Sequence, residues 1–199
     1  MGGLCGQFVR IGRPAQSSYN AAVRALTDAA KLERFMERLG REARGPGRIY
    51  LVGGATAVLY GWRPSTVDAD LKLDPEPPGV FEAIRRLKDE LDINVELASP
   101  DDFIPAVPGW RERSPFVARH GQIDFHHYDL LTQALAKIER GHTQDLADVR
   151  EMIARGLVSE DGLRRAFLDI EAELIRYPAV DADAFRAQVD AFLGAGEAA

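Results

Sequence analysis

Two kinds of hydrophobic pattern occur in the first two thirds of the chain. Short apolar runs that stop at glycine, proline or a polar turn are typical of β-strands, whereas apolar residues spaced three or four apart indicate amphipathic helices. The runs predict strands over 49–52, 67–73 and 93–98, and a hairpin of 116–120 and 122–128 about Gly121. The spaced pattern predicts helices over 19–39, 55–60 and 80–91. Strands and helices alternate along the chain, so we expect an α/β (α+β) core.

From Asp129 onward the pattern is helical. Asp129 is placed to cap a helix that Gly141 ends, and Thr143 is placed to cap the next one. Two further amphipathic stretches, 159–177 and 181–193, predict the closing helices. We therefore divide the chain into a mobile N-terminal segment (1–17), a core (18–128) and a C-terminal helical region (129–199).

Composition narrows the class of protein. A chain of 199 residues with 46% hydrophobic residues can bury a proper core. The single cysteine, Cys5, excludes an intramolecular disulfide. Neither a membrane-spanning run nor a secretory signal pattern is visible, so we expect a soluble cytoplasmic protein with no membrane partner. The net charge of −6 argues against broad nonspecific binding of nucleic acid, but it leaves room for a local basic cleft.

The stretch 49–74 carries the first candidate chemistry. Gly53 and Gly54 follow a strand directly, and a glycine pair there lets a phosphate approach the backbone. Asp68 and Asp70 occupy alternate positions of the next strand, so both side chains point the same way, about 7 Å apart. Two carboxylates at that spacing are costly unless a cation lies between them. The pattern therefore predicts a site for a metal ion and a phosphate.

The stretch GGATAVLYGWRPSTVDADL resembles the signature of the polymerase-beta-like nucleotidyltransferase superfamily, a Gly-Gly turn followed by an Asp-x-Asp strand. More narrowly, it resembles AbiEii- and MenT-like nucleotidyltransferase toxins of toxin–antitoxin pairs. Arg63 lies one residue further from Asp68 than it does in that pattern. A Gly-Gly turn or an Asp-x-Asp sequence alone is common by chance, whereas their conjunction is far more demanding.

The resemblance implies a nucleotidyltransferase sheet with flanking helices and a C-terminal helical bundle. It also implies Mg²⁺ (or Mn²⁺) held by Asp68, Asp70 and a third carboxylate. Glu96 has the expected place in chain order for that third ligand, and Asp124 is the second contender. The alternative for Glu96 is an ordinary exposed glutamate on a strand.

The same resemblance assigns nucleotide contacts. Gly53 and Gly54 would meet the β- and γ-phosphates through their backbone amides, and Arg63 and Ser65 would lie nearby. Thr66 would touch the phosphates, or it would be a residue whose modification silences the enzyme by adding negative charge.

A second group of charges lies in the helical region. Lys137 and Arg140 are three residues apart on one predicted helix, and Asp145 and Asp148 are three apart on the next, so each pair shares a face. By resemblance, these residues lie close to the nucleotide. Lys137 would engage the triphosphate, Arg140 would make a bidentate phosphate or carboxylate contact, and the two aspartates would orient these cations. The alternative is ordinary salt bridging between two surface helices.

The loop-rich stretch 101–119 is long for a connection inside a compact domain. Trp110, which looks exposed among arginines, could stack a nucleobase or plug the sheet edge, and we favour the plug. His126 and His127 are adjacent on a strand and face opposite sides, so we expect structural roles for both. The pairs Arg85-Arg86 and Arg111/Arg113 are candidate RNA contacts, although solvated patches are the commoner reason for such pairs.

By resemblance, the activity is transfer of NMP from an NTP to the 3′ end of tRNA by a toxin whose partner is a cognate antitoxin. The alternatives are modification of a protein hydroxyl or of a small molecule. An inactive partner-binding module of the same fold is a further alternative. The retained charges of Asp68, Asp70 and Lys137 argue against that last alternative.

Overall fold

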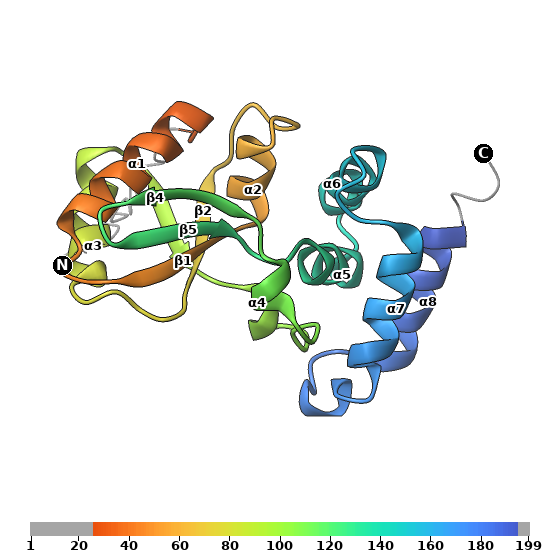
Figure 1. Cartoon of the computed structure of the whole chain (residues 1–199). Helices are drawn as coiled ribbons and strands as arrows, with labels where there is room; N and C mark the ends of the chain where they lie inside the picture. The colour runs from red at the N-terminus through yellow and green to blue at the C-terminus, as the bar shows by residue number, and fades with distance from the viewer. Residues whose placement is uncertain (1–25, 195–199) are drawn as a thin grey trace, which may run out of the picture.

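The computed structural model describes residues 26–194. The predicted mobile segment (1–17), Cys5 and the start of the helix predicted over 19–39 lie outside the described residues. Within them the fold is a five-stranded mixed sheet with helices on both faces (Figure 1). The predicted α+β class is therefore confirmed.

The sheet has the order β3-β2-β1-β5-β4. Its strands are β1 (Gly47–Val52), β2 (Asp68–Leu73), β3 (Asn94–Leu97), β4 (Phe116–His120) and β5 (Ile123–His127). β1 is the central strand; it runs antiparallel to β2 and parallel to β5, and β2 runs parallel to β3. The predicted hairpin about Gly121 is confirmed, since β4 and β5 pair antiparallel. The strands predicted over 49–52, 67–73 and 93–98 are confirmed as β1, β2 and β3, to within two residues at each end.

Helices and short turns fill the rest of the described chain. Before the last strands lie α1 (Ala29–Glu42), α2 (Gly53–Leu59), α3 (Val80–Glu90), the 3₁₀ turn η1 (Pro100–Asp102) and α4 (Trp110–Arg113). After them come α5 (Leu130–Arg140), α6 (Thr143–Ala154), α7 (Glu160–Glu171), the 3₁₀ turn η2 (Leu174–Arg176) and α8 (Ala182–Gly194).

Several predicted helix ends need correction. The first helix begins at Ala29 because Asp28 caps it, its side chain accepting a hydrogen bond from the backbone of Lys31. The helix predicted over 159–177 ends at Glu171, and its last turn continues only as the separate turn η2. Thr143 is the first helical residue of α6 rather than its cap, a position held by His142.

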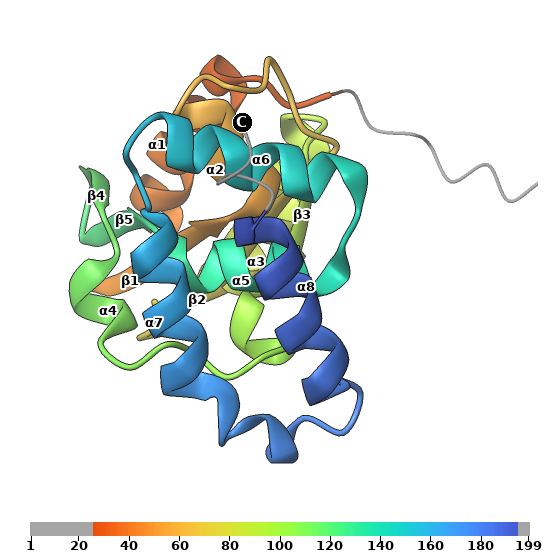
Figure 2. The same ribbon diagram turned by 90° about the vertical axis from the view of Figure 1, so that its right-hand side faces the viewer.

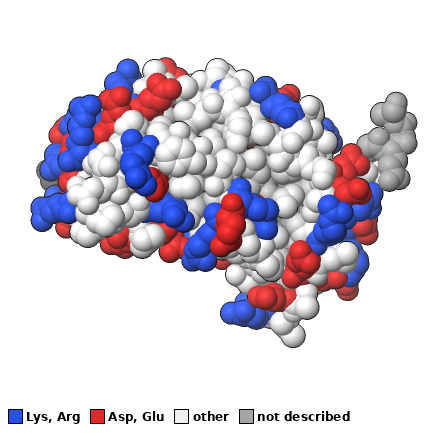
Figure 3. Space-filling view, in the orientation of Figure 1, with Lys and Arg blue, Asp and Glu red and all other residues white. Residues whose placement is uncertain are grey.

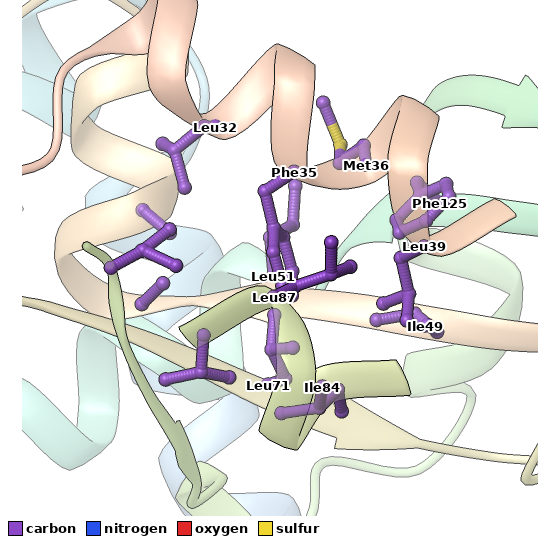
Figure 4. Close-up of a cluster of buried hydrophobic side chains, with 14 of the residues drawn as sticks. Leu32, Phe35, Met36, Leu39, Ile49, Leu51, Leu71, Ile84, Leu87 and Phe125 are labelled. Carbon is purple, nitrogen blue, oxygen red and sulfur yellow. The ribbon is translucent and has the colours of Figure 1, made fainter. Parts of the chain in front are cut away.

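One face of the sheet carries the main hydrophobic core. Apolar side chains of α1 and α3 meet those of β1, β2 and β5 there (Figure 4). Leu51 and Leu71 belong to this face, and residues that alternate with them in the strands point to the other face. The alternation that buries Leu71 is therefore the same alternation that turns Asp68 and Asp70 to the opposite side.

The opposite face is covered by α4, α5 and the helices behind α5. Trp110, the first residue of α4, packs against Tyr50 and Tyr128 and is only 7% exposed. The apparent exposure of Trp110 is thus corrected. Its favoured role as a hydrophobic plug is confirmed, but it covers Tyr50 on the central strand β1 and not the edge of the sheet. α5 also contacts α6, α7 and α8, which share a second core with it (Figures 1 and 2). The C-terminal bundle therefore fixes α5 against the face to which the aspartates point.

Within residues 26–194, every helix is too short or too polar to cross a lipid bilayer.

Candidate active site

A pocket of about 280 Å³ lies between the strands β1, β2 and β3 and the helix α5. Two of its walls carry opposite charge. Asp68, Asp70 and Glu96 line one side, and we call these three residues the carboxylate wall. Lys137 and Arg140 line another side; together with Asp145 and Asp148, which contact them, they form what we call the cation wall.

Strand register assembles the carboxylate wall. β2 and β3 are parallel neighbours in which Asp70 is paired with Glu96 and Asp68 with Asn94. Paired residues of adjacent strands project to the same face, so Glu96 lies directly beside Asp70. Asn94 donates a hydrogen bond from its amide nitrogen to Asp68 Oδ1 and a second, at 3.4 Å, to Glu96 Oε1.

The carboxylate wall is electrostatically uncompensated. Burial raises the pKa of Asp70 to about 6, and repulsion from Glu96 and Asp68 adds to the rise, while Arg140 and Lys137 oppose it. Among residues 26–194, no lysine or arginine forms an ion pair with any of the three carboxylates. The wall therefore favours a bound positive charge.

The donor set of the carboxylate wall fits a hard divalent cation. Mg²⁺ prefers oxygen ligands and is commonly held by one or two carboxylates together with water and substrate phosphates. In the described part of the chain, no three or more acidic, histidine or cysteine side chains come together as a group that could hold a metal ion by themselves. Asp68 and Asp70 with Glu96 beside them match the partial, carboxylate-only set that Mg²⁺ or Mn²⁺ takes with a nucleotide.

In the cation wall each positive charge is held by an aspartate. The Lys137 Nζ lies 2.9 Å from Asp145 Oδ1 and 2.6 Å from Asp148 Oδ2, and its side chain is 5% exposed. Arg140 contacts Asp145 at 2.9 Å, and its side chain is 48% exposed. These are the contacts by which the two aspartates were expected to orient the cations. The predicted geometry of this group is thus present, with Lys137 fixed inside and Arg140 at the rim.

Arg63 belongs to the same network but not to the pocket lining. Its guanidinium donates to both carboxylate oxygens of Asp148, at 2.8 and 2.5 Å, and the Trp62 indole donates to the same carboxylate at 3.1 Å. The expected contact of Arg63 with nucleotide is therefore replaced by a bidentate contact with Asp148. This contact ties the turn after α2 to α6.

The two glycines have different roles. Gly53 lines the pocket with φ at +57°, and its backbone N–H donates to Gln133 Oε1 at 2.7 Å. That amide is therefore already occupied, contrary to its expected role toward phosphate. A Cβ on Gly54 would lie 2.1 Å from Thr66 Oγ1, so Gly54 is required by the packing of Thr66.

Ser65 and Thr66 also lie outside the pocket lining. The Thr66 hydroxyl donates to the backbone oxygen of Asp68 at 3.0 Å, and the Thr66 backbone pairs with Thr27. In this structure, the contacts of Thr66 hold the start of β2, the strand that carries Asp68.

Asp124 is separate from the carboxylate wall, which corrects its expectation as a third metal ligand. It lies on β5 opposite Arg48, near the start of β1, whereas the pocket lies at the end of β1. Arg119 neutralises it, with a contact of 2.5 Å. Glu96 lines the same pocket as Asp68 and Asp70, and it is exposed on β3, so its role as a third metal ligand stays a prediction.

His126, His127 and three of the four candidate RNA-binding arginines have structural contacts, whereas the fourth, Arg85, is exposed on α3. His127 is buried, contacts Thr56 Oγ1 at 3.1 Å, and burial lowers its pKa to about 4. His126 packs beside Tyr50. The candidate RNA contacts Arg86, Arg111 and Arg113 are ion-paired with Glu42, Asp74 and Asp129, respectively.

Among the residues in or near the pocket that the sequence patterns did not single out, three bear on its chemistry. Gln133 is 1% exposed and precedes Lys137 by one helical turn; the spacing 133, 137, 140 along α5 was a usable signal. Asn94 precedes Glu96 by two strand positions, so the alternation rule could also have found it. Phe103 lines the pocket after η1, and only the fold reveals this.

A mixed sheet that aligns three carboxylates against a cationic helix is the architecture of an α+β nucleotidyltransferase-like protein. Residues 30–192 match the family described as "Nucleotidyltransferase of unknown function (DUF6036)", and the chain belongs to this family. No curated protein and no solved structure matches the chain. The family supports membership of the nucleotidyltransferase superfamily, while the narrower likeness to AbiEii- and MenT-like toxins stays a prediction.

Proposed function

We propose that the protein transfers NMP from an NTP to an acceptor hydroxyl in a reaction that depends on Mg²⁺ or Mn²⁺. The acceptor oxygen forms a bond to the α-phosphorus, and the bond to the β-phosphate breaks, so that pyrophosphate leaves. The observation that carries this proposal is the pocket itself, in which an uncompensated carboxylate wall faces Lys137 and Arg140. A metal–triphosphate complex has the charge distribution that such a pocket complements, since its cation suits the carboxylates and its phosphates suit the basic side chains.

Each group has a definite part in the proposed reaction. Asp68, Asp70 and Glu96 would hold the metal ion, which would supply positive charge against the triphosphate and make the attacking hydroxyl more acidic. Arg140, with a half-exposed side chain, reaches the phosphates from the rim. Lys137 contributes a fixed positive charge from inside, because Asp145 and Asp148 hold its ammonium group in place.

We propose the 3′ end of tRNA as the acceptor and a toxin, paired with a cognate antitoxin, as the biological role. The support for both is the likeness of 53–71 to the toxin families. Blocking the tRNA 3′ end would prevent aminoacylation and so inhibit translation.

A protein hydroxyl or a small molecule is the second candidate acceptor, and a specific observation favours it. Arg86, Arg111 and Arg113 are each paired with a carboxylate, which weakens their pull on RNA phosphates. On the face shown in Figure 3, blue and red side chains lie next to each other over most of the charged areas.

The test is incubation of the purified protein with Mg²⁺, each α-³²P-labelled NTP in turn, total bacterial RNA and lysate protein. Label on tRNA that is lost in Asp70→Ala supports the tRNA proposal. Label on protein would identify a protein hydroxyl as the acceptor, and label on a small molecule would identify that molecule as the acceptor. A wild-type protein that labels nothing and binds no NTP contradicts the proposed activity.

A further inference from the structure

The third wall of the pocket is apolar and bears an exposed aromatic ring. Ala98, Pro100, Phe103 and Ala136 line it. Phe103 is 53% exposed and belongs to neither core, although its neighbour Ile104 is buried in the second one. Exposing a large aromatic side chain in a pocket forgoes hydrophobic stabilisation, and such surfaces commonly mark a ligand contact.

The segment that presents Phe103 is held firmly. The Ser99 backbone N–H donates to Asp102 Oδ2 at 2.7 Å, and Lys72 pairs with Asp101 at 2.7 Å. The backbone N–H of Phe103 donates to the carbonyl oxygen of Pro100 at 3.0 Å. The position of the exposed ring is therefore determined by the turn, and not by packing of the ring itself.

The uncharged polar side chains of the pocket are already satisfied. Its lining contains two of them, Ser99 and Gln133. The Ser99 hydroxyl donates to Asp101 Oδ1 at 2.6 Å, and the Gln133 amide is bound to Gly53 and to the Tyr128 carbonyl. A planar group on the apolar wall would thus meet stacking surface, with few free partners for hydrogen bonds at its edge.

We propose that Phe103 is a stacking platform for the nucleobase of the donor nucleotide, and that it sets a base preference by stacking. This proposal rests on the proposed function. The platform and the two charged walls line one pocket, so a single ligand with a triphosphate and a base can contact all three. Aromatic stacking tolerates every base and favours the larger ring systems. The enzyme therefore accepts all four NTPs and binds purine nucleotides several-fold more tightly than pyrimidine nucleotides.

The test measures equilibrium binding of Mg²⁺ complexes of ATP, GTP, CTP and inorganic tripolyphosphate by calorimetry, without an acceptor. We expect wild-type protein to bind ATP at least tenfold more tightly than tripolyphosphate. Phe103→Ala should weaken ATP binding about tenfold and leave tripolyphosphate binding unchanged, whereas Phe103→Trp should keep ATP binding. Phe116→Ala is the matched control, because Phe116 is 60% exposed on β4 and lies outside this pocket.

The outcomes separate the platform from the activity. Equal binding of ATP and tripolyphosphate, with NMP transfer intact, overturns the platform and leaves the proposed function standing. A hundredfold preference between ATP and GTP also overturns it, since that requires reading of base edges. If Phe103→Ala binds ATP normally but raises the KM for the acceptor, the ring serves the acceptor and the proposal is wrong. If the wild-type protein binds neither ATP nor tripolyphosphate, both the proposed function and the platform are wrong.

Discussion

The two charged walls of the pocket differ in whether their charges are paired with opposite charges. In the carboxylate wall, Asp70 is surrounded by like charge, and its pKa is raised to about 6. In the cation wall, Lys137 is in direct contact with the opposite charges of Asp145 and Asp148. One wall therefore destabilises its own charges, and the other stabilises them.

This difference indicates which wall changes when a ligand binds. A cluster of like charges gains most from a cation that enters it, so the carboxylate wall is where binding energy is largest. A cluster of paired charges is already ordered, so the cation wall can present Lys137 and Arg140 without reorganisation. The contrast leads to four predictions, beginning with the largest effect.

Asp70→Asn should abolish nucleotide transfer, with a decrease in kcat of about a thousandfold or more. The substitution keeps the shape of the side chain but removes the central negative charge of the carboxylate wall. The rate of NMP incorporation from labelled NTP measures the effect. Asp124→Asn, which removes an equivalent carboxylate on β5, should keep near wild-type activity. If Asp70→Asn keeps more than a tenth of the wild-type activity, the carboxylate wall does not take part in the reaction.

Lys137→Met should lower the free energy of unfolding by about 3 kcal/mol, because it leaves two buried aspartates without their shared partner. Urea denaturation monitored by circular dichroism measures this loss. Arg140→Ala should cost less than about 1 kcal/mol, since that ion pair is half-exposed. Adding Asp145→Asn to Lys137→Met should restore part of the stability. Equal losses for the Lys137 and Arg140 variants would contradict the distinction between an inner and a rim cation.

Asp70→Asn should also stabilise the metal-free protein at pH 8, by about 1 to 3 kcal/mol. The folded-state pKa of Asp70 is raised above its unfolded value, so stability from this group is complete below pH 4 and is lost as the pH rises through 6. Unfolding in urea with EDTA at pH 4 and pH 8 measures the difference, which should shrink at the lower pH. Asp124→Asn is the control of opposite sign, because Arg119 lowers the pKa of Asp124 and the substitution should slightly destabilise the protein. A stabilisation that is independent of pH would mean that the carboxylate wall is not strained by charge.

The contrast also shows which parts of the site the sequence could predict. Side-chain alternation along one strand put Asp68 and Asp70 on one face, and helical spacing put Lys137 and Arg140 on one face. Both predictions depend on local geometry alone. The choice between Glu96 and Asp124 depended on which strands are neighbours and in what register, and nothing local determines that β3 lies beside β2.

Local sequence patterns likewise could not predict the contacts between segments that are far apart in the chain. The motif placed Arg63 near a nucleotide, yet its partner is Asp148, in a helix that follows much later in the chain. Trp110 looked exposed because its neighbours are charged, and it is buried because α4 packs onto Tyr50 and Tyr128. Sequence patterns thus predicted the elements and most of their faces, whereas partners across the fold required the structure.

The smallest predicted effect concerns the residue that joins the two walls. Gln133 stands on α5, one turn before Lys137, and accepts the backbone N–H of Gly53 next to the carboxylate wall. Gln133→Ala leaves that N–H without its acceptor, so we expect a loss of about 1 kcal/mol in stability and about a tenfold lower kcat with little change in KM. Gln133→Met, which fills similar space without an acceptor for Gly53, should be as slow as Gln133→Ala. Gln144→Ala, an exposed glutamine on α6, should change neither quantity. If Gln133→Met keeps the wild-type kcat, the hydrogen bond to Gly53 does not position the site, and Gln133 only fills space between α5 and the sheet.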